Sequence, residues 1–395
     1  MQLAFRHITI CMASDMRLEE RGLIFDASGR PVDERVAAFV SLCALGSGSI
    51  ICGFQLGAKK HAVKGTIRLC RSRDGGATWT ELPARFESTL DGVPGSLSSG
   101  EIVEIDPGKL MLMATWFDRS DPARPLFDPE TEGILHSRQL KSYSNDDGDS
   151  WTAWQQVPVK ELTGCSSTGP ILKWSDGTIA YPFESYKDYD DPRPAAHGAW
   201  LLISRDGGRS FGRLQLVARH PEQRIYYWDQ RLCTGETAGE YIAMFWTHDL
   251  KRKTDLTVHF RRGNIGKSAD DRASIHDIGI PGQIAAPLLL PDGRALAFVV
   301  DRGQPATMTL WQSRDGGRTW PRSDALVVYM HDEQAGLTQK RHDIDFKQYW
   351  LDMAKWSFGH PAVRRLPDGR VLVAHYAGTP ECMSVHWARI DTRDA

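Results

Sequence analysis

Ser72-Arg73-Asp74-Gly75-Gly76-Ala77-Thr78-Trp79 is the first of four copies of one short signature in this 395-residue chain. The other copies begin at Ser144, Ser204 and Ser313 and share with it the pattern Ser-x-Asp-x-Gly-x-Ser/Thr-aromatic. Ser and Asp side chains bond backbone amides inside a turn, the second glycine position allows a positive φ, and the aromatic residue anchors the next strand. The chain is therefore a repeat protein whose repeat contains a β-hairpin.

The spacing of the signatures indicates the architecture. They begin at residues 72, 144, 204 and 313, so the last gap accommodates two repeats, one of which has lost its signature. An all-β repeat of roughly 50–70 residues is typical of a β-propeller, in which four-stranded blades surround a central axis.

A second hairpin recurs ahead of each signature. Its clearest copies surround Asp292-Gly293 and Asp368-Gly369, where apolar runs flank a turn that favours two-residue hairpins. Looser copies surround Asp176-Gly177, Pro107-Gly108 and the glycines between Val36 and Phe54, and the weakest lies between Ile225 and Phe245. Six repeats are thus present.

We therefore predict an all-β, six-bladed β-propeller of four-stranded antiparallel blades that forms one domain over residues 1–395. The expected blades span residues 33–85, 98–160, 165–220, 224–275, 281–330 and 357–395. The last blade runs out of chain after its third strand, so we expect the N-terminal segment 3–12, with Leu3–Ile10 as its strand, to complete it. Closing the ring in this way removes an exposed sheet edge.

Composition limits the partners of such a protein. The formal net charge of −2 gives no reason to expect nucleic acid or an anionic membrane as a partner, and no apolar run has the length of a membrane span. Seven cysteines without Cys-x-x-Cys spacing, and no visible secretory signal, favour reduced thiols in a cytoplasmic protein. We expect no cofactor and no metal, because no close His/Asp spacing marks a metal site.

The signature is similar to the Asp-box, or BNR, repeat of the sialidase superfamily, whose members are six-bladed propellers. Through the repeats, the resemblance extends over nearly the whole chain. It is specific for the fold and less so for activity, because propellers with Asp boxes also serve as other glycosidases, polysaccharide lyases and binding modules. Function has to be argued from the site.

Propeller geometry locates that site. Both kinds of turn lie on one face, so the opposite face is built from residues just before each first strand and just after each second strand. Carboxylates, arginines and aromatic side chains converging there suit sugar recognition and acid–base chemistry. The candidates on this axial face are Arg35, His61, Glu184, Trp228, Asp229, Arg231, His248, Gln283, Arg302, His360, His375 and Tyr376.

The resemblance assigns some of these positions. Sialidases bind the substrate carboxylate with three arginines, and use a tyrosine paired with a glutamate as nucleophile and an aspartate as acid/base. Arg35, in Arg35-Val36-Ala37, corresponds to the first arginine, and Arg231 and Arg302 are looser matches. Gly359-His360-Pro361 stands where the tyrosine is expected, and the loop 59–64 offers no carboxylate for the acid/base position. The chain therefore diverges from true sialidases at both catalytic positions.

These departures lead to a functional hypothesis. We expect a glycoside hydrolase of sialidase-like fold that acts on a small carbohydrate or oligosaccharide, most simply an anionic one. An imidazole titrates near neutral pH, so His360 is the expected general acid/base, and Asp229, Tyr376 and His61 are the other catalytic candidates. The expected substrate-binding residues are Arg35, Arg231, Arg302, Gln283, Trp228, Glu184, His248 and His375.

Several alternatives stay open. The same site could break the bond by β-elimination, as a lyase does, or the propeller could bind carbohydrate without catalysis, and each histidine could be structural. Two insertions, 117–139 and 330–356, are candidate lids, and the second carries a pattern that predicts a short amphipathic helix. Either insertion could instead form a contact in a homo-oligomer.

Overall fold

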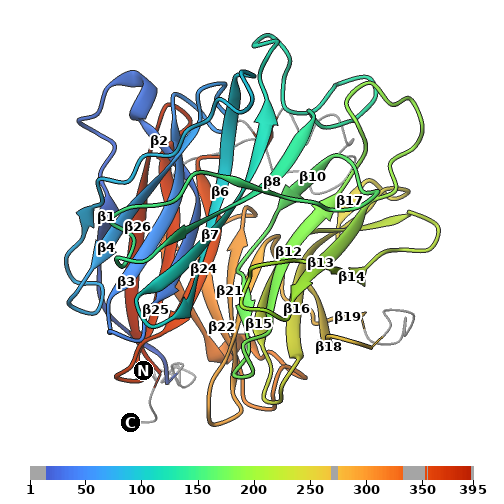
Figure 1. The fold of residues 1–395 in the computed structure, drawn as a ribbon. Helices are drawn as coiled ribbons and strands as arrows, with labels where there is room; N and C mark the ends of the chain where they lie inside the picture. The colour runs from blue at the N-terminus through green and yellow to red at the C-terminus, as the bar shows by residue number, and fades with distance from the viewer. Residues whose placement is uncertain (1–14, 268–274, 332–351, 354, 393–395) are drawn as a thin grey trace, which may run out of the picture.

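The computed structural model describes residues 15–267, 275–331, 352–353 and 355–392. Within these ranges the chain forms six antiparallel blades arranged around an axis (Figure 1), and the first and last blades join in one eight-stranded sheet. The all-β, six-bladed prediction is confirmed. In the described ranges, no helix is long and apolar enough to cross a membrane.

Each blade begins with an inner strand and proceeds outward. The strands of blades one to three are β2 (Val36–Ala44), β3 (Ile50–Gly57), β4 (Thr66–Ser72) and β5 (Thr80–Glu81); β6 (Gly95–Asp106), β7 (Lys109–Asp118), β8 (Ser137–Ser144) and β9 (Gln155–Val157); and β10 (Cys165–Ser167) with β11 (Leu172–Lys173), β12 (Ile179–Ser185), β13 (Gly198–Ser204) and β14 (Arg213–Ala218). The strands of blades four to six are β15 (Ile225–Thr234), β16 (Glu240–Asp249) with β17 (Thr254–Asp255), β18 (His259–Asn264) and β19 (Ile275–Asp277); β20 (Ala285–Leu289), β21 (Ala295–Asp301), β22 (Thr307–Ser313) and β23 (Ala325–Met330); and β24 (Phe358–Arg365), β25 (Val371–Thr379), β26 (Cys382–Asp391) and β1 (Arg17–Phe25). Two single-turn 3₁₀ helices, η1 (Val32–Glu34) and η3 (Arg322–Asp324), precede β2 and β23.

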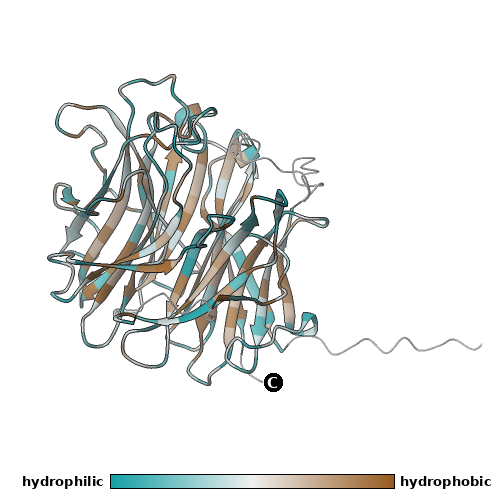
Figure 2. Ribbon diagram, turned by 90° about the vertical axis from the view of Figure 1, so that its right-hand side faces the viewer, coloured by the Kyte–Doolittle hydropathy of each residue, from teal (hydrophilic) through white to brown (hydrophobic). Residues whose placement is uncertain are grey.

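The middle strands of the blades carry the hydrophobic core. β3, β12 and β22 are buried along their whole length, because each blade packs between two neighbours and has no solvated face. The sequences of β3 and β12 are therefore mostly apolar, whereas β22 also buries Thr307, Thr309, Gln312 and Ser313. Brown, hydrophobic segments run through the strands of the blades (Figure 2). This packing holds the inner strands in fixed positions around the axis.

The ring closes in the last blade, as predicted, but with a different segment. β1 (Arg17–Phe25) pairs antiparallel with β26 from Arg17↔Asp391 to Phe25↔Val385. The segment proposed for this role, Leu3–Ile10, lies outside the described residues. β1 contains charged residues such as Glu19 and Glu20, so its sequence resembles that of a loop. Charged side chains are nevertheless typical of a strand at a sheet edge.

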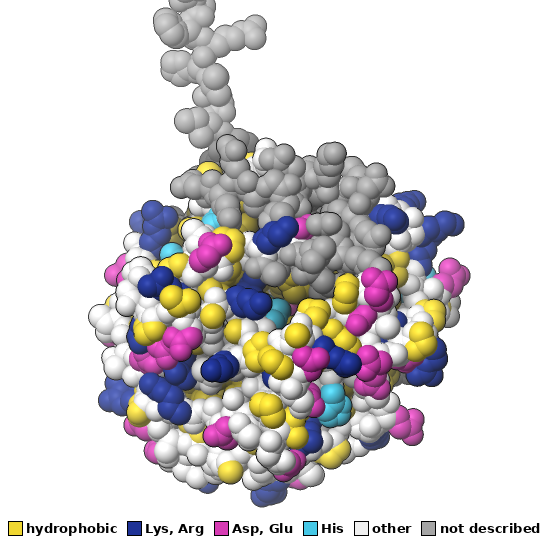
Figure 3. All heavy atoms as spheres, turned by 90° about the horizontal axis from the view of Figure 1, so that it is seen from above, with side chains coloured by type: hydrophobic (Ala, Val, Ile, Leu, Met, Phe, Trp, Pro, Cys, Tyr) yellow, Lys and Arg dark blue, Asp and Glu magenta, His cyan; other side chains and the backbone are white. Residues whose placement is uncertain are grey.

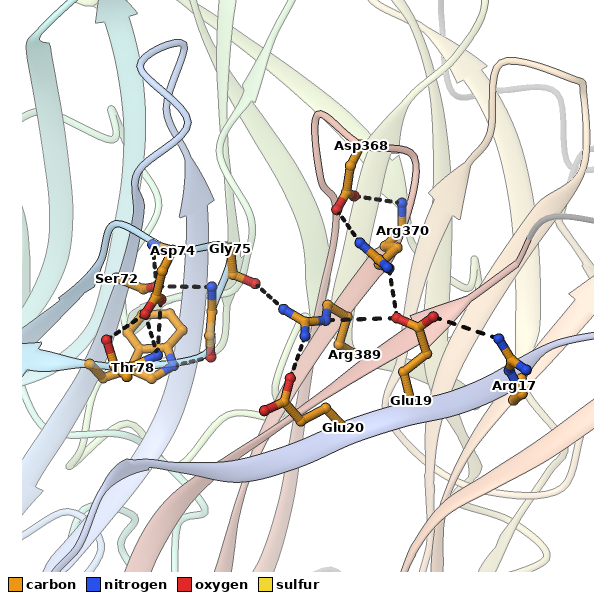
Figure 4. Close-up of polar contacts among 12 residues, drawn as sticks. Arg17, Glu19, Glu20, Ser72, Asp74, Gly75, Thr78, Asp368, Arg370 and Arg389 are labelled. Carbon is orange, nitrogen blue, oxygen red and sulfur yellow. Dashed lines mark hydrogen bonds and ion pairs between the residues drawn. The ribbon is translucent and has the colours of Figure 1, made fainter.

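A charged network seals the closure from outside (Figure 4). Arg389 on β26 donates to Glu20 on β1 and, over 3.3 Å, to the carbonyl of Gly75 in the first Asp box. Glu19 on β1 pairs at 2.6 Å with Arg370, at the start of β25. The network thus joins the last blade to the first Asp box.

The Asp boxes connect the third and fourth strands of blades one, two, three and five. In the first box the Ser72 hydroxyl donates to Asp74 over 2.8 Å and accepts from the Gly76 amide over 2.9 Å. The Thr78 amide and hydroxyl donate to the Asp74 carboxylate over 2.9 and 2.6 Å. In the second box Asp147 takes the place of Gly75 with a positive φ of 55°, a conformation that aspartate tolerates.

We predict that Asp74→Ala lowers the free energy of unfolding by about 1–2 kcal/mol, because two donors of the turn lose their acceptor. These bonds lower the pKa of Asp74 from 3.8 to about 2, so the stabilisation is complete above pH 3.8 and disappears as the pH falls towards 2. Urea unfolding at neutral and acidic pH measures both effects. Arg73→Ala, in the same turn but exposed, is the control; an equal loss in both variants would contradict the assignment.

Candidate active site

Four inner strands carry a β-bulge at the same level. In β2, β6, β15 and β24 two residues stand opposite one, and the first of each pair has a positive φ between 46° and 57°. These residues are Phe39, Ser99, Asp229 and His360. A bulge changes the direction of a side chain, and the ring centroids of Phe39 and His360, from adjacent blades, lie 5.3 Å apart. The bulges therefore turn one side chain from each of these blades towards the axis.

His360 is held between two partners deep in this site. Its Nδ1 lies 3.2 Å from the Val40 carbonyl, so this nitrogen carries the proton, and Nε2 then accepts from the Arg231 guanidinium. Burial, and next the charge of Arg231, hold the pKa of His360 well below its ordinary value. Both nitrogens are used and the ring is neutral, so this geometry does not offer His360 to a substrate as the expected general acid/base. Its position instead orients Arg231.

Arg231 is surrounded by opposite charges. Its guanidinium lies 3.7 Å from Glu101 and 3.8 Å from Asp229, and its side chain is 3% exposed. Burial raises the pKa of Glu101 to about 7, although Arg231 opposes the shift. Asp229 is 30% exposed, unlike the other two. Of these three charged groups, Asp229 is thus the one that reaches the open side.

Glu184 backs Asp229 from the neighbouring blade. Its carboxylate accepts from the Gln230 amide over 3.1 Å and from the Tyr186 hydroxyl over 2.7 Å, and the side chain is buried. Burial, and next repulsion from Asp229, raise the pKa of Glu184, while burial also raises the pKa of Asp229. Arg231 and Arg302 oppose the shift of Asp229. Two neighbouring carboxyls whose pKa values are both raised can donate and accept a proton.

A polar relay holds Arg302. The guanidinium donates to the side chain of Gln283 and, over 2.7 Å, to the carbonyl of Phe358. Gln283 donates to Asp255 over 3.1 Å, and Asp255 lies 3.1 Å from Nδ1 of His248. Gln283 and His248, which the sequence offers as substrate-binding residues, therefore orient Arg302 within the protein.

Buried aromatic rings and a buried lysine lie around Arg302. The Arg302 guanidinium lies 4.3 Å from the Trp356 ring centroid, and the ammonium of Lys60 lies 5.6 Å from that of Tyr376. Burial raises the pKa of Tyr376, and the charge of Arg302 opposes this rise. Gly359, opposite Tyr376 in the sheet, has a φ of 145°, and a side chain there would collide with Arg302. Seen from this face, basic side chains and a histidine lie near the middle (Figure 3).

Two other predicted residues lie in the interior. Trp228 is buried, and its ring stacks on that of His248 with centroids 5.3 Å apart, so it packs behind the relay that holds Arg302. His61 contacts Phe39 with centroids 4.6 Å apart, and neither of its ring nitrogens has a hydrogen-bond partner among the described residues. Burial, followed by Lys60 and Arg119, lowers the pKa of His61 to about 3. His61 is therefore neutral.

Arg35 and His375 lie apart from this cluster. Arg35 follows η1, its Nε donates to the Arg30 carbonyl over 2.7 Å, and its own carbonyl accepts from Met383 on β26. Its guanidinium is thus used at the seam between the last and first blades. His375 stacks on His386 and contacts Tyr329 within the core. The positions before a first strand and after a second strand are thus not all axial.

Sequence reasoning missed Glu101 and Lys60 as site residues. Glu101 follows the bulge at Ser99, and Lys60 is buried with its ammonium near the rings of Tyr376 and Trp356. The first insertion packs on blade three through Phe127, Ile134 and Leu135. Residues 332–351, with the expected amphipathic helix, lie outside the described ranges.

The described residues contain no group of three or more His, Cys, Asp or Glu side chains placed to hold a metal ion. The site consists instead of the buried guanidiniums of Arg231 and Arg302, the carboxyls of Glu101, Glu184 and Asp229, and the hydroxyl of Tyr376. Such a set can bind an anion and exchange a proton.

Comparison with solved structures identifies the fold. A protein of unknown function from Dyadobacter fermentans superposes with a TM-score of 0.70 at 18% identity, over 96% of this chain and 100% of that one. The Hadza microbial sialidase Hz136 gives a TM-score of 0.64 at 15% identity, over 93% and 68% of the two chains. A Penicillium chrysogenum α-L-arabinanase complexed with arabinobiose gives 0.62 at 15% identity, over 95% and 99%.

No protein-family model matches the sequence, and no curated protein shows significant similarity to it. The structural comparisons nevertheless show that the chain has the sialidase-like propeller fold, which it shares with glycosidases. At these identities the likeness concerns the fold alone.

We predict that Glu101→Gln makes the stability of the protein less dependent on pH. The unfolded chain ionises Glu101 near pH 4.5, whereas the folded protein keeps the proton up to about pH 7, so the wild type loses stability as the pH rises through this window. Relative to the wild type, the variant should gain about 1–3 kcal/mol between pH 4.5 and 7. Chemical unfolding across this range measures the difference. Glu222→Gln, at an exposed position, should show none; a parallel profile for Glu101→Gln would contradict the prediction.

Proposed function

We propose that this protein is a glycoside hydrolase that acts on an acidic sugar at the axial site. The observation that supports the proposal best is that two carboxyls lie beside buried guanidiniums: Asp229 is 3.8 Å from Arg231, and Glu184 accepts from the amide of the next residue, Gln230. Glycoside hydrolysis needs a proton donor next to a group that tolerates positive charge at the sugar. An arginine binds a carboxylate through two parallel hydrogen bonds.

Asp229 is the proposed acid/base because it is partly exposed, whereas Glu184 is buried behind it. Glu184 acts as a positioning residue: its negative charge, when present, opposes ionisation of Asp229, and its bond to the Gln230 amide fixes the bulge. Arg302 binds the substrate anion, and Tyr376 packs against the sugar next to it. The neutral His360 holds Arg231 in place.

We expect Asp229→Asn to lower kcat by about 100-fold or more, which is the usual contribution of a general acid or base. The assay uses chromogenic glycosides of sialic acid, glucuronic acid and arabinose, with wild type first to identify the substrate. Glu222→Gln, which changes an exposed carboxyl, is the control. Full turnover by Asp229→Asn would exclude Asp229, and an unsaturated product from the wild type would indicate elimination in place of hydrolysis.

We expect Arg302→Met to raise KM for the acidic glycoside by about tenfold or more, with KM for a neutral glycoside unchanged, because only the acidic sugar loses an ion pair. The matched control is Arg35→Met, since Arg35 is bound at the seam between blades. An equal rise in KM for both substrates would mean that Arg302 supports the fold and does not bind the anion. A rise in KM for Arg35→Met alone would restore the sequence-based assignment.

A further inference from the structure

A cavity lies on the axis at the end of the ring opposite the candidate active site. It has a volume of about 290 Å³, and all six inner strands or the residues beside them contribute to its wall. The wall is formed by the ends of these strands that lead into the Asp-Gly turns, so this rear pocket opens on the face opposite the candidate active site. It continues inward to a narrow space lined by Glu101 and Arg231.

The rear pocket holds a guanidinium that has no carboxylate partner. Arg364, on β24, makes one hydrogen bond within the described part of the chain, from Nη1 to the carbonyl of Val363 over 2.8 Å, and no ion pair within 4 Å. Glu101, the nearest carboxyl that attracts it, already lies 3.7 Å from Arg231. Burial lowers the pKa of Arg364, and its half-buried side chain lines the pocket.

The other charged groups of the rear pocket are engaged. Lys173 donates to the carbonyls of Glu104 and Ile105 over 2.9 and 2.7 Å. The carboxylate of Glu104 accepts from the amides of Gly46 and Gly108 over 2.6 and 3.1 Å. With Arg364 and Lys173 against Glu104, the lining carries one net positive charge, and the rest of the wall is largely apolar.

We propose that the rear pocket binds a small organic monocarboxylate, whose carboxylate pairs with Arg364 while its apolar body packs against Ile171, Leu232 and Leu288. A guanidinium recognises a carboxylate through two parallel hydrogen bonds, and one negative charge balances the lining. The volume suits a molecule of the size of a benzoate ion. This site is separate from the proposed active site and does not depend on its function.

Calorimetric titration with benzoate tests the proposal, with benzamide as the neutral analogue. The wild type should bind one benzoate saturably, and benzamide about tenfold or more weakly. Arg364→Met should weaken benzoate binding by a similar factor, whereas Arg365→Met, the exposed neighbour on the same strand, should not. Leu288→Trp, which narrows the mouth without changing the charge, should also weaken it and covers the case in which Arg364→Met does not fold.

The variant Arg302→Met distinguishes benzoate binding in the rear pocket from binding in the candidate active site. Benzoate binding that survives in this variant and falls in Arg364→Met supports the rear pocket. Binding that falls only in Arg302→Met places the anion in the candidate active site and overturns the proposal. An absence of saturable benzoate binding to the wild type, or equal affinity of Arg364→Met and wild type, overturns it as well.

Discussion

The antiparallel ladder between β1 and β26 joins the two ends of the chain and holds the six blades in a ring. An open ring would expose the edge of β26 and leave the inner strands free to separate. Arg389 extends the closure to the first Asp box. The groups on the axis come from several blades, so the distances between groups of different blades depend on this closure.

Bulges convert the closed ring into a site. A regular inner strand would alternate its side chains between the two neighbouring blades, whereas the positive φ at Asp229 and His360 turns them to the axis. Charged groups then meet away from water, which is costly unless they are paired. Here Arg231 lies between Glu101, Asp229 and His360, and this pairing holds the site in one arrangement.

The axis has two ends of different chemistry. Towards the long loops, partly exposed Asp229 and the aromatic rings around Arg302 form the site for which we propose an acidic sugar. Towards the Asp-Gly turns, Arg364 lies in a small apolar pocket. The sialidase and the arabinanase that share this fold show that the propeller frame is compatible with different sugars. At its bulges this chain presents Phe39, Ser99, Asp229 and His360.

The sequence by itself determined the propeller, because the Asp boxes and Asp-Gly turns are local patterns whose hydrogen bonds form within a few residues, as between Ser72 and Thr78. It also predicted Asp229, Arg231 and Arg302 on one face, and the structure brings the charges of these three residues together. It could not show that β1 begins at Arg17, that Arg35 serves the seam, or that His375 lies in the core. Nor could it show Glu101 and Lys60 in the site. Those facts depend on bulges and on contacts between blades far apart in the chain, so only the closed ring decided which side chains meet.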